Sequence, residues 1–213
     1  MNKKLSLSYT SVAKSADHSS AGVTIEVPQT QLEEVSVGQQ LTATVLQGFG
    51  SQFKEAVAED QANLFLTVDS PTNFEISAES QATINAKVTG TPSTLEVDAI
   101  DQSSVSIQGA ITKAEVKDQA TLSILSGSSF PTHAVVAGDQ SSVEVDPSVS
   151  GGCSGVLGLQ TDDDNNDSQA DCSETSGGEV PFVGEAAGKG IMQCNFGAVD
   201  VESNTKSYLR QSK

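Results

Sequence analysis

The densest cluster of potential metal ligands spans residues 162–167, the run Asp-Asp-Asp-Asn-Asn-Asp. Closely spaced oxygen ligands of this kind suit Ca²⁺, which takes about six to eight of them. We expect Asp162, Asp164 and Asp167 to supply those ligands. Binding of Ca²⁺ to the folded chain should then raise its melting temperature. The run lacks the sixth-position glycine of an EF-hand loop, so a solvated acidic loop is the alternative. Asn166-Asp167-Ser168 is also a formal N-glycosylation sequence.

The three cysteines, Cys153, Cys172 and Cys194, all lie in the last third of the chain. Their spacing matches no zinc pattern, and no histidine lies near them, so a disulfide in an exported protein is favoured over metal ligation. We expect Cys153 and Cys172 to form a disulfide that closes the acidic loop. Cys194 is then left over or pairs between chains.

Residues suited to catalysis do not form a recognisable constellation. The only arginine is Arg210, near the end of the chain, whereas a polysaccharide lyase needs cationic groups beside its base. Carboxylates are too numerous for their presence to identify the pair that glycoside hydrolysis requires. No Gly-x-Ser-x-Gly elbow with a histidine partner is present, and His133 follows Pro131-Thr132 in a predicted surface turn. We therefore expect no enzymatic activity and no catalytic residues.

The elements that must position these residues are predicted by an internal repeat. Five segments share a seven-residue pattern: Asp or Ser, Gln, a small residue, a polar residue, an aliphatic residue, any residue, and an aliphatic residue or Ala. They begin at Asp60, Ser80, Asp101, Asp118 and Asp139, 17 to 21 residues apart. The alternation within each copy predicts a strand with one buried face. A second short alternating run and turn residues follow most copies, so each unit holds two strands and two turns.

Such a unit fits either a β-sandwich or a β-solenoid. Only a solenoid gives a reason to restore the same pattern in every unit, because each position of a coil then meets the same surroundings. We therefore predict an all-β fold, a single-stranded parallel β-helix (β-solenoid) with coils of about 20 residues and an irregular Gly/Asp-rich C-terminal segment. The predicted interior column consists of Leu64, Ile84, Val105, Leu122 and Val143.

The repeat divides the chain into three parts. Residues 1–23 form an N-terminal arm or cap, residues 24–149 the β-solenoid, and residues 150–213 a Cys-containing, acidic and Gly-rich C-terminal segment. Within the last part, residues 197–202 alternate and are expected to add one more strand or to close the last coil.

Two side-chain rows follow from stacking the coils. The glutamines either form an amide ladder or simply face solvent at a turn; they are Gln61, Gln81, Gln102, Gln119 and Gln140. The aspartates either repel one another in an exposed row or each cap their own turn through a backbone N–H, and we favour capping. They are Asp60, Asp101, Asp118 and Asp139.

One family shows similar motifs. The run Ile-Glu-Val-Pro-Gln-Thr-Gln-Leu-Glu-Glu-Val-Ser-Val at 25–37, the run Leu-Thr-Ala-Thr-Val at 41–45 and the Ser/Ala-x-Val-x-Ile coils carry the likeness. Together they resemble the auto-transporter adhesin head GIN domain, over about residues 24–149. The resemblance implies a right-handed parallel β-helix of the kind found in secreted and surface proteins, and it identifies no catalytic residues. The family often has Gly-Ser or Gly-Asn turns where this chain has Asp-Gln.

Composition narrows the possible partners. Eleven Lys and Arg against 28 Asp and Glu give a net charge of −17, which opposes binding to nucleic acid or anionic membrane. No apolar run approaches the roughly 20 residues of a transmembrane helix. Two N-terminal lysines precede no apolar stretch, so the chain either carries no signal peptide or is a mature form. We expect a secreted or cell-surface location.

These observations predict a non-enzymatic extracellular structural or adhesion-type module. Its expected contacts are protein or glycan surfaces, or further copies of itself, with no cofactor other than the Ca²⁺ considered above. Two alternatives stay open: a viral or phage fibre or capsid component, and a polysaccharide-active β-helix enzyme.

Overall fold

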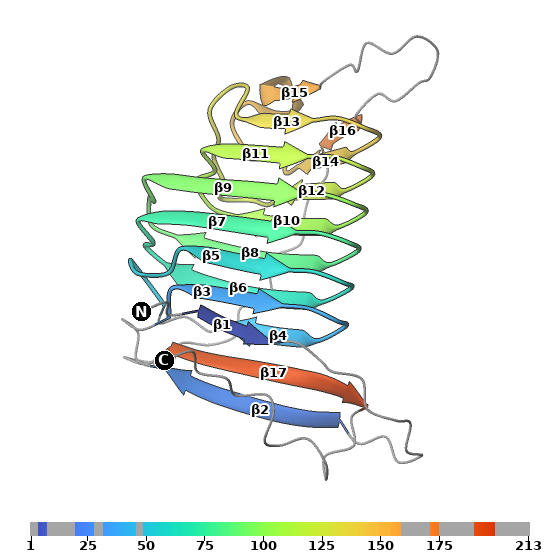
Figure 1. The fold of residues 1–213 in the computed structure, drawn as a ribbon. Coiled ribbons are helices and arrows are strands. Elements are labelled where there is room, and N and C mark those ends of the chain that lie inside the picture. Colours follow the sequence, from blue (N-terminus) through green and yellow to red (C-terminus); the bar gives the residue numbers. More distant parts are fainter. Residues whose placement is uncertain are drawn as a thin grey trace.

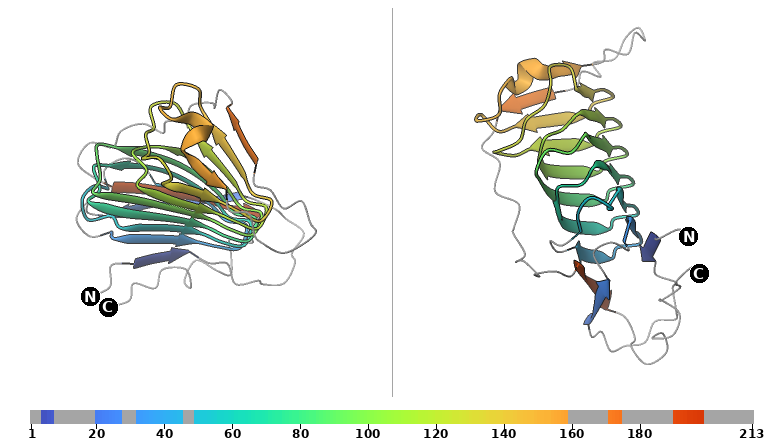
Figure 2. Two further views of the ribbon diagram at one scale, coloured as in Figure 1. Left: turned by 90° about the horizontal axis from the view of Figure 1, so that it is seen from above. Right: turned by 90° about the vertical axis from the view of Figure 1, so that its left-hand side faces the viewer.

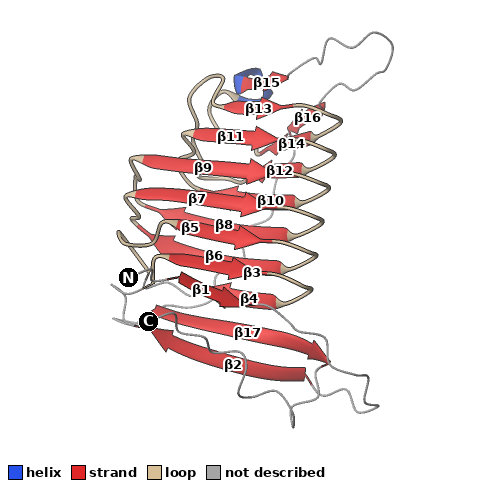
Figure 3. Ribbon diagram, viewed as in Figure 1, coloured by secondary structure: helices blue, strands red, loops and turns tan. Residues whose placement is uncertain are grey.

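The computed structural model describes residues 4–7, 20–27, 32–45, 49–158, 171–174 and 190–198. In this part the chain winds into a parallel β-solenoid of about six turns, with coils about 21 residues apart (Figure 1). Each coil contributes one strand to each of two facing sheets, which we call sheet A and sheet B. The only helical element among the described residues is a 3₁₀ turn, η1 (Gly152–Gly155), at the C-terminal end (Figure 3).

Sheet A is parallel throughout its described strands, because every strand returns to the sheet after one full coil. Its order is β1 (Lys4–Leu7), β3 (Glu34–Val37), β5 (Glu55–Ala58), β7 (Asn73–Ala78), β9 (Thr94–Ala99), β11 (Lys113–Val116), β13 (Val135–Ala137) and β15 (Val156–Gly158).

Sheet B is parallel except at its N-terminal end. Its order is β16 (Asp171–Glu174), β14 (Ser142–Val145), β12 (Thr121–Ile124), β10 (Ser104–Gln108), β8 (Thr83–Thr89), β6 (Asn63–Asp69), β4 (Thr42–Val45), β17 (Gly190–Ala198) and β2 (Ser20–Val27). Strand β17 runs antiparallel to both β4 and β2.

The strands of one coil are joined by a tight corner turn. In the coil formed by β5 and β6, the Ala62 N–H donates to the Glu59 carbonyl at 3.0 Å, and the two residues between them have φ of 52° and 66°. Two successive left-handed residues are the mark of a type I′ turn. The corner repeats in the next coils, so the coils lie over one another when viewed from above (Figure 2).

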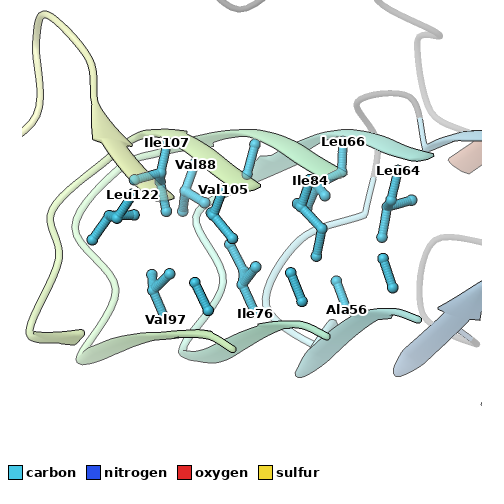
Figure 4. Close-up of a cluster of buried hydrophobic side chains, with 14 of the residues drawn as sticks. Ala56, Leu64, Leu66, Ile76, Ile84, Val88, Val97, Val105, Ile107 and Leu122 are labelled. Carbon is cyan, nitrogen blue, oxygen red and sulfur yellow. The ribbon is translucent and has the colours of Figure 1, made fainter. Parts of the chain in front are cut away.

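The predicted interior column is confirmed. Strand registers pair Leu64 with Ile84, Ile84 with Val105, Val105 with Leu122, and Leu122 with Val143. All five side chains have 0% exposure, and facing side chains from sheet A, such as Ile76 and Val97, complete the core between the sheets (Figure 4). The small residues after the glutamines are buried as well, because they point inward at the corner; they are Ala62, Ala82, Ser103, Ala120 and Ser141.

The two ends of the solenoid are closed differently. At the N-terminal end β17 lies between β4 and β2, with Cys194 paired in register to Ala43 and Val23. Of the run 197–202, only Gly197 and Ala198, at the end of β17, are described, so the expected strand over 197–202 stays a prediction. At the C-terminal end, η1 and β16 are joined by a disulfide between Cys153 and Cys172, whose Cα atoms are 5.8 Å apart. The predicted pairing of these two cysteines agrees with this structure.

Candidate functional site

The corner turns carry a continuous amide ladder. Gln61 Nε2 donates to Gln81 Oε1 at 2.9 Å, and Gln81 Nε2 donates to Gln102 Oε1 at 3.1 Å. The same contact links Gln102 to Gln119 at 3.3 Å and Gln119 to Gln140 at 3.2 Å. All donors point toward the C-terminal end, so the amide dipoles add along the solenoid axis. Of the two interpretations of these glutamines, the ladder is therefore correct.

The ladder contains one more glutamine than the repeat predicted. Gln40 Nε2 donates to Gln61 Oε1 at 2.9 Å, and Gln39 and Gln40 have φ of 57° and 63°, as in the other corners. The sequence pattern missed this copy because Gln39 replaces Asp and Leu41 replaces the small residue. The signal that could have found it is the alternating run Thr42-Ala43-Thr44-Val45 directly after it.

The corner aspartates line a groove beside the ladder. This open groove has a volume of about 1000 Å³. It is lined by both rows of corner residues, among them Asp60, Asp101, Asp118 and Asp139. Among the described residues, no hydrogen bond joins these carboxylates to a backbone N–H, so the favoured capping interpretation is not observed. Each turn is closed by the backbone, and Asp suits its position because it tolerates left-handed φ.

The outer surface of sheet A is acidic. Its strand registers place Glu34, Glu55, Glu75 and Glu96 in one column that crosses four neighbouring strands. Lysines lie on and beside this surface: Lys54 Nζ is 3.0 Å from Glu33 Oε2, Lys113 Nζ is 4.0 Å from Glu96 Oε2, and Lys117 pairs with Glu115. We call this surface the acidic face.

Crowding on the acidic face shifts several pKa values. Partial burial raises the pKa of the Glu75 carboxyl, and the nearby charges of Glu55, Asp98 and Glu96 raise it further. Burial also raises the pKa of Asp98, against the opposing effect of Lys113. A hydrogen bond from Lys117 lowers the pKa of Glu115. The pKa values of carboxyls at the centre of the face are thus raised, while an ion pair with Lys117 lowers that of Glu115.

The outer surface of sheet B is different, because two of its columns carry almost no charge, although the next column along the strands contains Lys87. Two in-register columns cross strands β4 to β14. The first is Thr42, Asn63, Thr83, Ser104, Thr121 and Ser142, and the second is Thr44, Phe65, Asn85, Ser106, Ser123 and Glu144. All twelve are partly exposed, and Glu144 is the only charged residue among them. Neighbouring coils lie about 4.8 Å apart and neighbouring columns about 6.7 Å apart. We call this surface the neutral face.

The other residues that the sequence singled out lie partly inside and partly outside the described structure. Asp162, Asp164 and Asp167 lie outside the described residues, so calcium binding there stays a prediction. Cys194 lies in β17, of which only the backbone is described. His133 is exposed in a turn with φ of 64°, as expected. In the described part of the chain, no group of three His, Cys, Asp or Glu residues is arranged to hold a metal ion.

Fold and surfaces together define the class of this chain: it is a parallel β-solenoid with an acidic face, a neutral face and a corner lined by a glutamine ladder. No family model matches the chain, and no match was found among curated proteins or solved structures. Across the described ranges, the structure has no helix of the length and apolar character that crossing a membrane requires.

Proposed function

We propose that this chain is a non-enzymatic, exported module of structural or adhesion type, and that its neutral face makes contact with an extended surface. The observation that carries the proposal is the distribution of charge. In a chain of net charge −17, twelve in-register positions on one side of the solenoid include a single charged residue, Glu144. A surface built of stacked hydroxyl and amide groups can form many weak hydrogen bonds at once.

The same distribution indicates the kind of surface. An anionic polymer is repelled by the acidic face and by the net charge of the chain. An uncharged glycan meets no such barrier, and its hydroxyls can exchange hydrogen bonds with Thr, Ser and Asn side chains. The neutral face is rigid, because the residues between its outward positions are locked in the core. Rigidity lowers the entropy lost on binding.

Two further observations support export and adhesion. A disulfide between Cys153 and Cys172 is typical of proteins that leave the reducing cytosol. The runs at 25–37 and 41–45 and the strand pattern of the coils also carry the resemblance to the adhesin head GIN domain described above. Both observations favour an extracellular role over that of an intracellular enzyme.

Sedimentation with insoluble polysaccharides tests the proposal. The purified chain is mixed with uncharged polysaccharides and, as a comparison, with uronate-rich or sulfated ones, and loss of protein from the supernatant is measured. We expect binding to at least one uncharged polymer, weak dependence on salt, and no release of reducing ends. Release of sugar would support the enzyme alternative, and a stable trimer in native mass spectrometry would support the fibre alternative. Binding only to the anionic polymers would contradict the proposal.

A further inference from the structure

Strand β16 is attached to the last coil by few contacts. It pairs with β14 over four residues, with Cys172 opposite Val143 and Glu174 opposite Val145. It is the edge strand of sheet B, so no strand covers its other side within the described residues. Among the described side chains of β16, Cys172 packs, partly buried, against the hydrophobic core. A four-residue edge ladder with one apolar contact belongs to the low-stability end of a fold.

The disulfide is the main tie that holds β16 in place. It links Cys172 to Cys153 in η1, which also lies against β14 and β16. The two cysteines are 19 residues apart in the sequence. Opening the bond removes this covalent tie and leaves the short ladder and the contacts with η1 to hold the strand.

Release of β16 uncovers a specific binding edge. Val143 and Val145 are fully buried in β14, and their strand would then present unpaired backbone groups. The element that fits this edge is β16 itself, because its register and its cysteine already match. A second copy of the chain carries the same strand. Exchange of an identical element between copies requires no new complementary surface.

We propose that the C-terminal end of the solenoid is a thiol-controlled exchange site, at which β16 of one copy pairs with β14 of a second copy. In the exchanged dimer, Cys153 of each copy is bonded to Cys172 of the other. Reciprocal exchange closes a dimer, and one-way exchange extends an open chain of copies. The interaction is independent of the neutral face, which lies on the outer surface of sheet B.

The connecting segments are long enough for the exchange. Residues 159–170 join β15 to β16, and residues 175–189 join β16 to β17. At most about 3.5 Å per residue, they reach roughly 40 and 50 Å. In sheet B, β16 and β17 are separated by seven strand steps, which at about 4.8 Å each amount to roughly 34 Å. The remaining length allows β16 to reach a second copy whose C-terminal end faces the first.

The chemistry is thiol–disulfide exchange without net oxidation. The thiolate of a small thiol attacks the sulfur of Cys172, so the Cys153–Cys172 bond breaks, a mixed disulfide forms, and Cys153 leaves as a thiolate. Cys153 of the second copy then attacks that mixed disulfide and expels the small thiolate. Each copy consumes and returns one small thiol, so the numbers of protein disulfides and of electrons are unchanged.

Isotope mixing tests the exchange on the full chain. Equal amounts of ¹⁴N- and ¹⁵N-labelled protein are incubated at high concentration with or without glutathione as the small thiol, trapped by alkylation, digested unreduced and analysed by mass spectrometry. We expect Cys153–Cys172 peptides that join the two isotopes, together with a doubling of native mass, only in the thiol-treated sample. Samples treated at low protein concentration should keep single-isotope peptides, because the disulfide then re-forms within one copy faster than between two copies.

Two results would overturn the proposal. One is a thiol-treated sample in which alkylation shows that the disulfide opened, yet every Cys153–Cys172 peptide joins a single isotope. The other is a disulfide that the thiol does not open while the protein is folded. A Cys194→Ser variant is the control, and it should exchange as the wild type does. Loss of the mixed peptides in this variant would assign them to scrambling through Cys194 and would equally reject the exchange site.

Discussion

The column of small residues at the corner turns contains two buried hydroxyl groups. The corner column contains Ala62, Ala82 and Ala120, but also Ser103 and Ser141, which are 2% and 1% exposed. The Oγ atoms of both serines are buried and make no hydrogen bond within the described structure. A buried hydroxyl without a partner costs free energy that a methyl group does not.

Replacing serine by alanine in this column should therefore raise the free energy of unfolding, and replacing alanine by serine should lower it. We expect Ser103→Ala to raise the free energy of unfolding by about 1 kcal/mol, because the unpaired hydroxyl is removed from an otherwise unchanged site. Ala120→Ser, in the same column, should lower it by a similar amount. Both changes are measured by urea denaturation, with the wild type and the variants fitted to a common slope of the free energy of unfolding against urea concentration. A loss of stability in Ser103→Ala would show that its hydroxyl has a partner.

Carboxylates on the acidic face give a pH dependence whose sign follows from their pKa values. The pKa of Glu75 is raised in the folded state, mainly by burial, so the folded chain binds this proton more tightly than the unfolded chain does. Stability is thus lost as pH rises through the raised pKa. We expect Glu75→Gln to raise the melting temperature at pH 7, and the gain to vanish below about pH 3.5, where the carboxyl is protonated in both states.

Glu115 supplies the control for this experiment. Its pKa is lowered by the hydrogen bond from Lys117, so its ionised form stabilises the fold above its unfolded pKa. Glu115→Gln should lower the melting temperature at pH 7, and this loss should also vanish at acid pH. Shifts of the same sign in both variants would mean that general charge repulsion, and not the local environment, controls stability on this face.

At the scale of the elements, the strand repeat determines which side chains are inside. Val105 and Ser106 are neighbours in β10, yet Val105 is completely buried and Ser106 lies on the neutral face. We expect Val105→Asp to cost several kcal/mol, because it buries an unpaired charge. Ser106→Asp should stay within about 0.5 kcal/mol of the wild type. Thermal melts followed by circular dichroism compare the two. Equal losses would contradict the stacked register.

The sequence predicted the repeated elements well, because each copy places the same residue types in the same surroundings. Alternation identified the strands, and the spacing of Val105 and its equivalents identified the interior column. The position of β17 was not predictable in the same way. Its neighbours β4 and β2 are far away in sequence, and a strand that lies outside the repeat gives no pattern from which its partner can be predicted. The residues of each repeat predict where its strands lie, whereas they do not predict which strand covers the end of the solenoid.

The faces of the solenoid were only partly predictable for a related reason. The glutamine ladder follows from one repeated residue, and the sequence indicated it. The neutral face requires knowledge of which strands pair in sheet B and of the register between them, and only then do Thr83, Ser104 and Thr121 form a column. The acidic loop lies outside the described residues, so its calcium site remains a prediction from the sequence.

At the scale of the whole molecule, charge is sorted by side. Carboxylates lie on the acidic face and along the corner groove, while the two columns of the neutral face contain one, Glu144, and have Lys87 in the column beside them. Acidic surfaces keep an extended rod soluble and discourage unspecific association through its long sides. The neutral face remains as the side on which close contact with an uncharged surface is not opposed by charge. This sorting is the central claim about function.

A matched pair of double variants tests that claim most directly. One carries Ser104→Glu and Ser142→Glu on the neutral face, and the other carries Ser36→Glu and Ser77→Glu on the acidic face. Within each pair the two sites lie two strands apart in one sheet, and all four serines are partly exposed. Sedimentation with the uncharged polysaccharide bound by the wild type is measured for both, after equal melting temperatures are confirmed. We predict that the first variant loses binding and that the second keeps it. Equal binding by both variants would contradict the assignment of the neutral face.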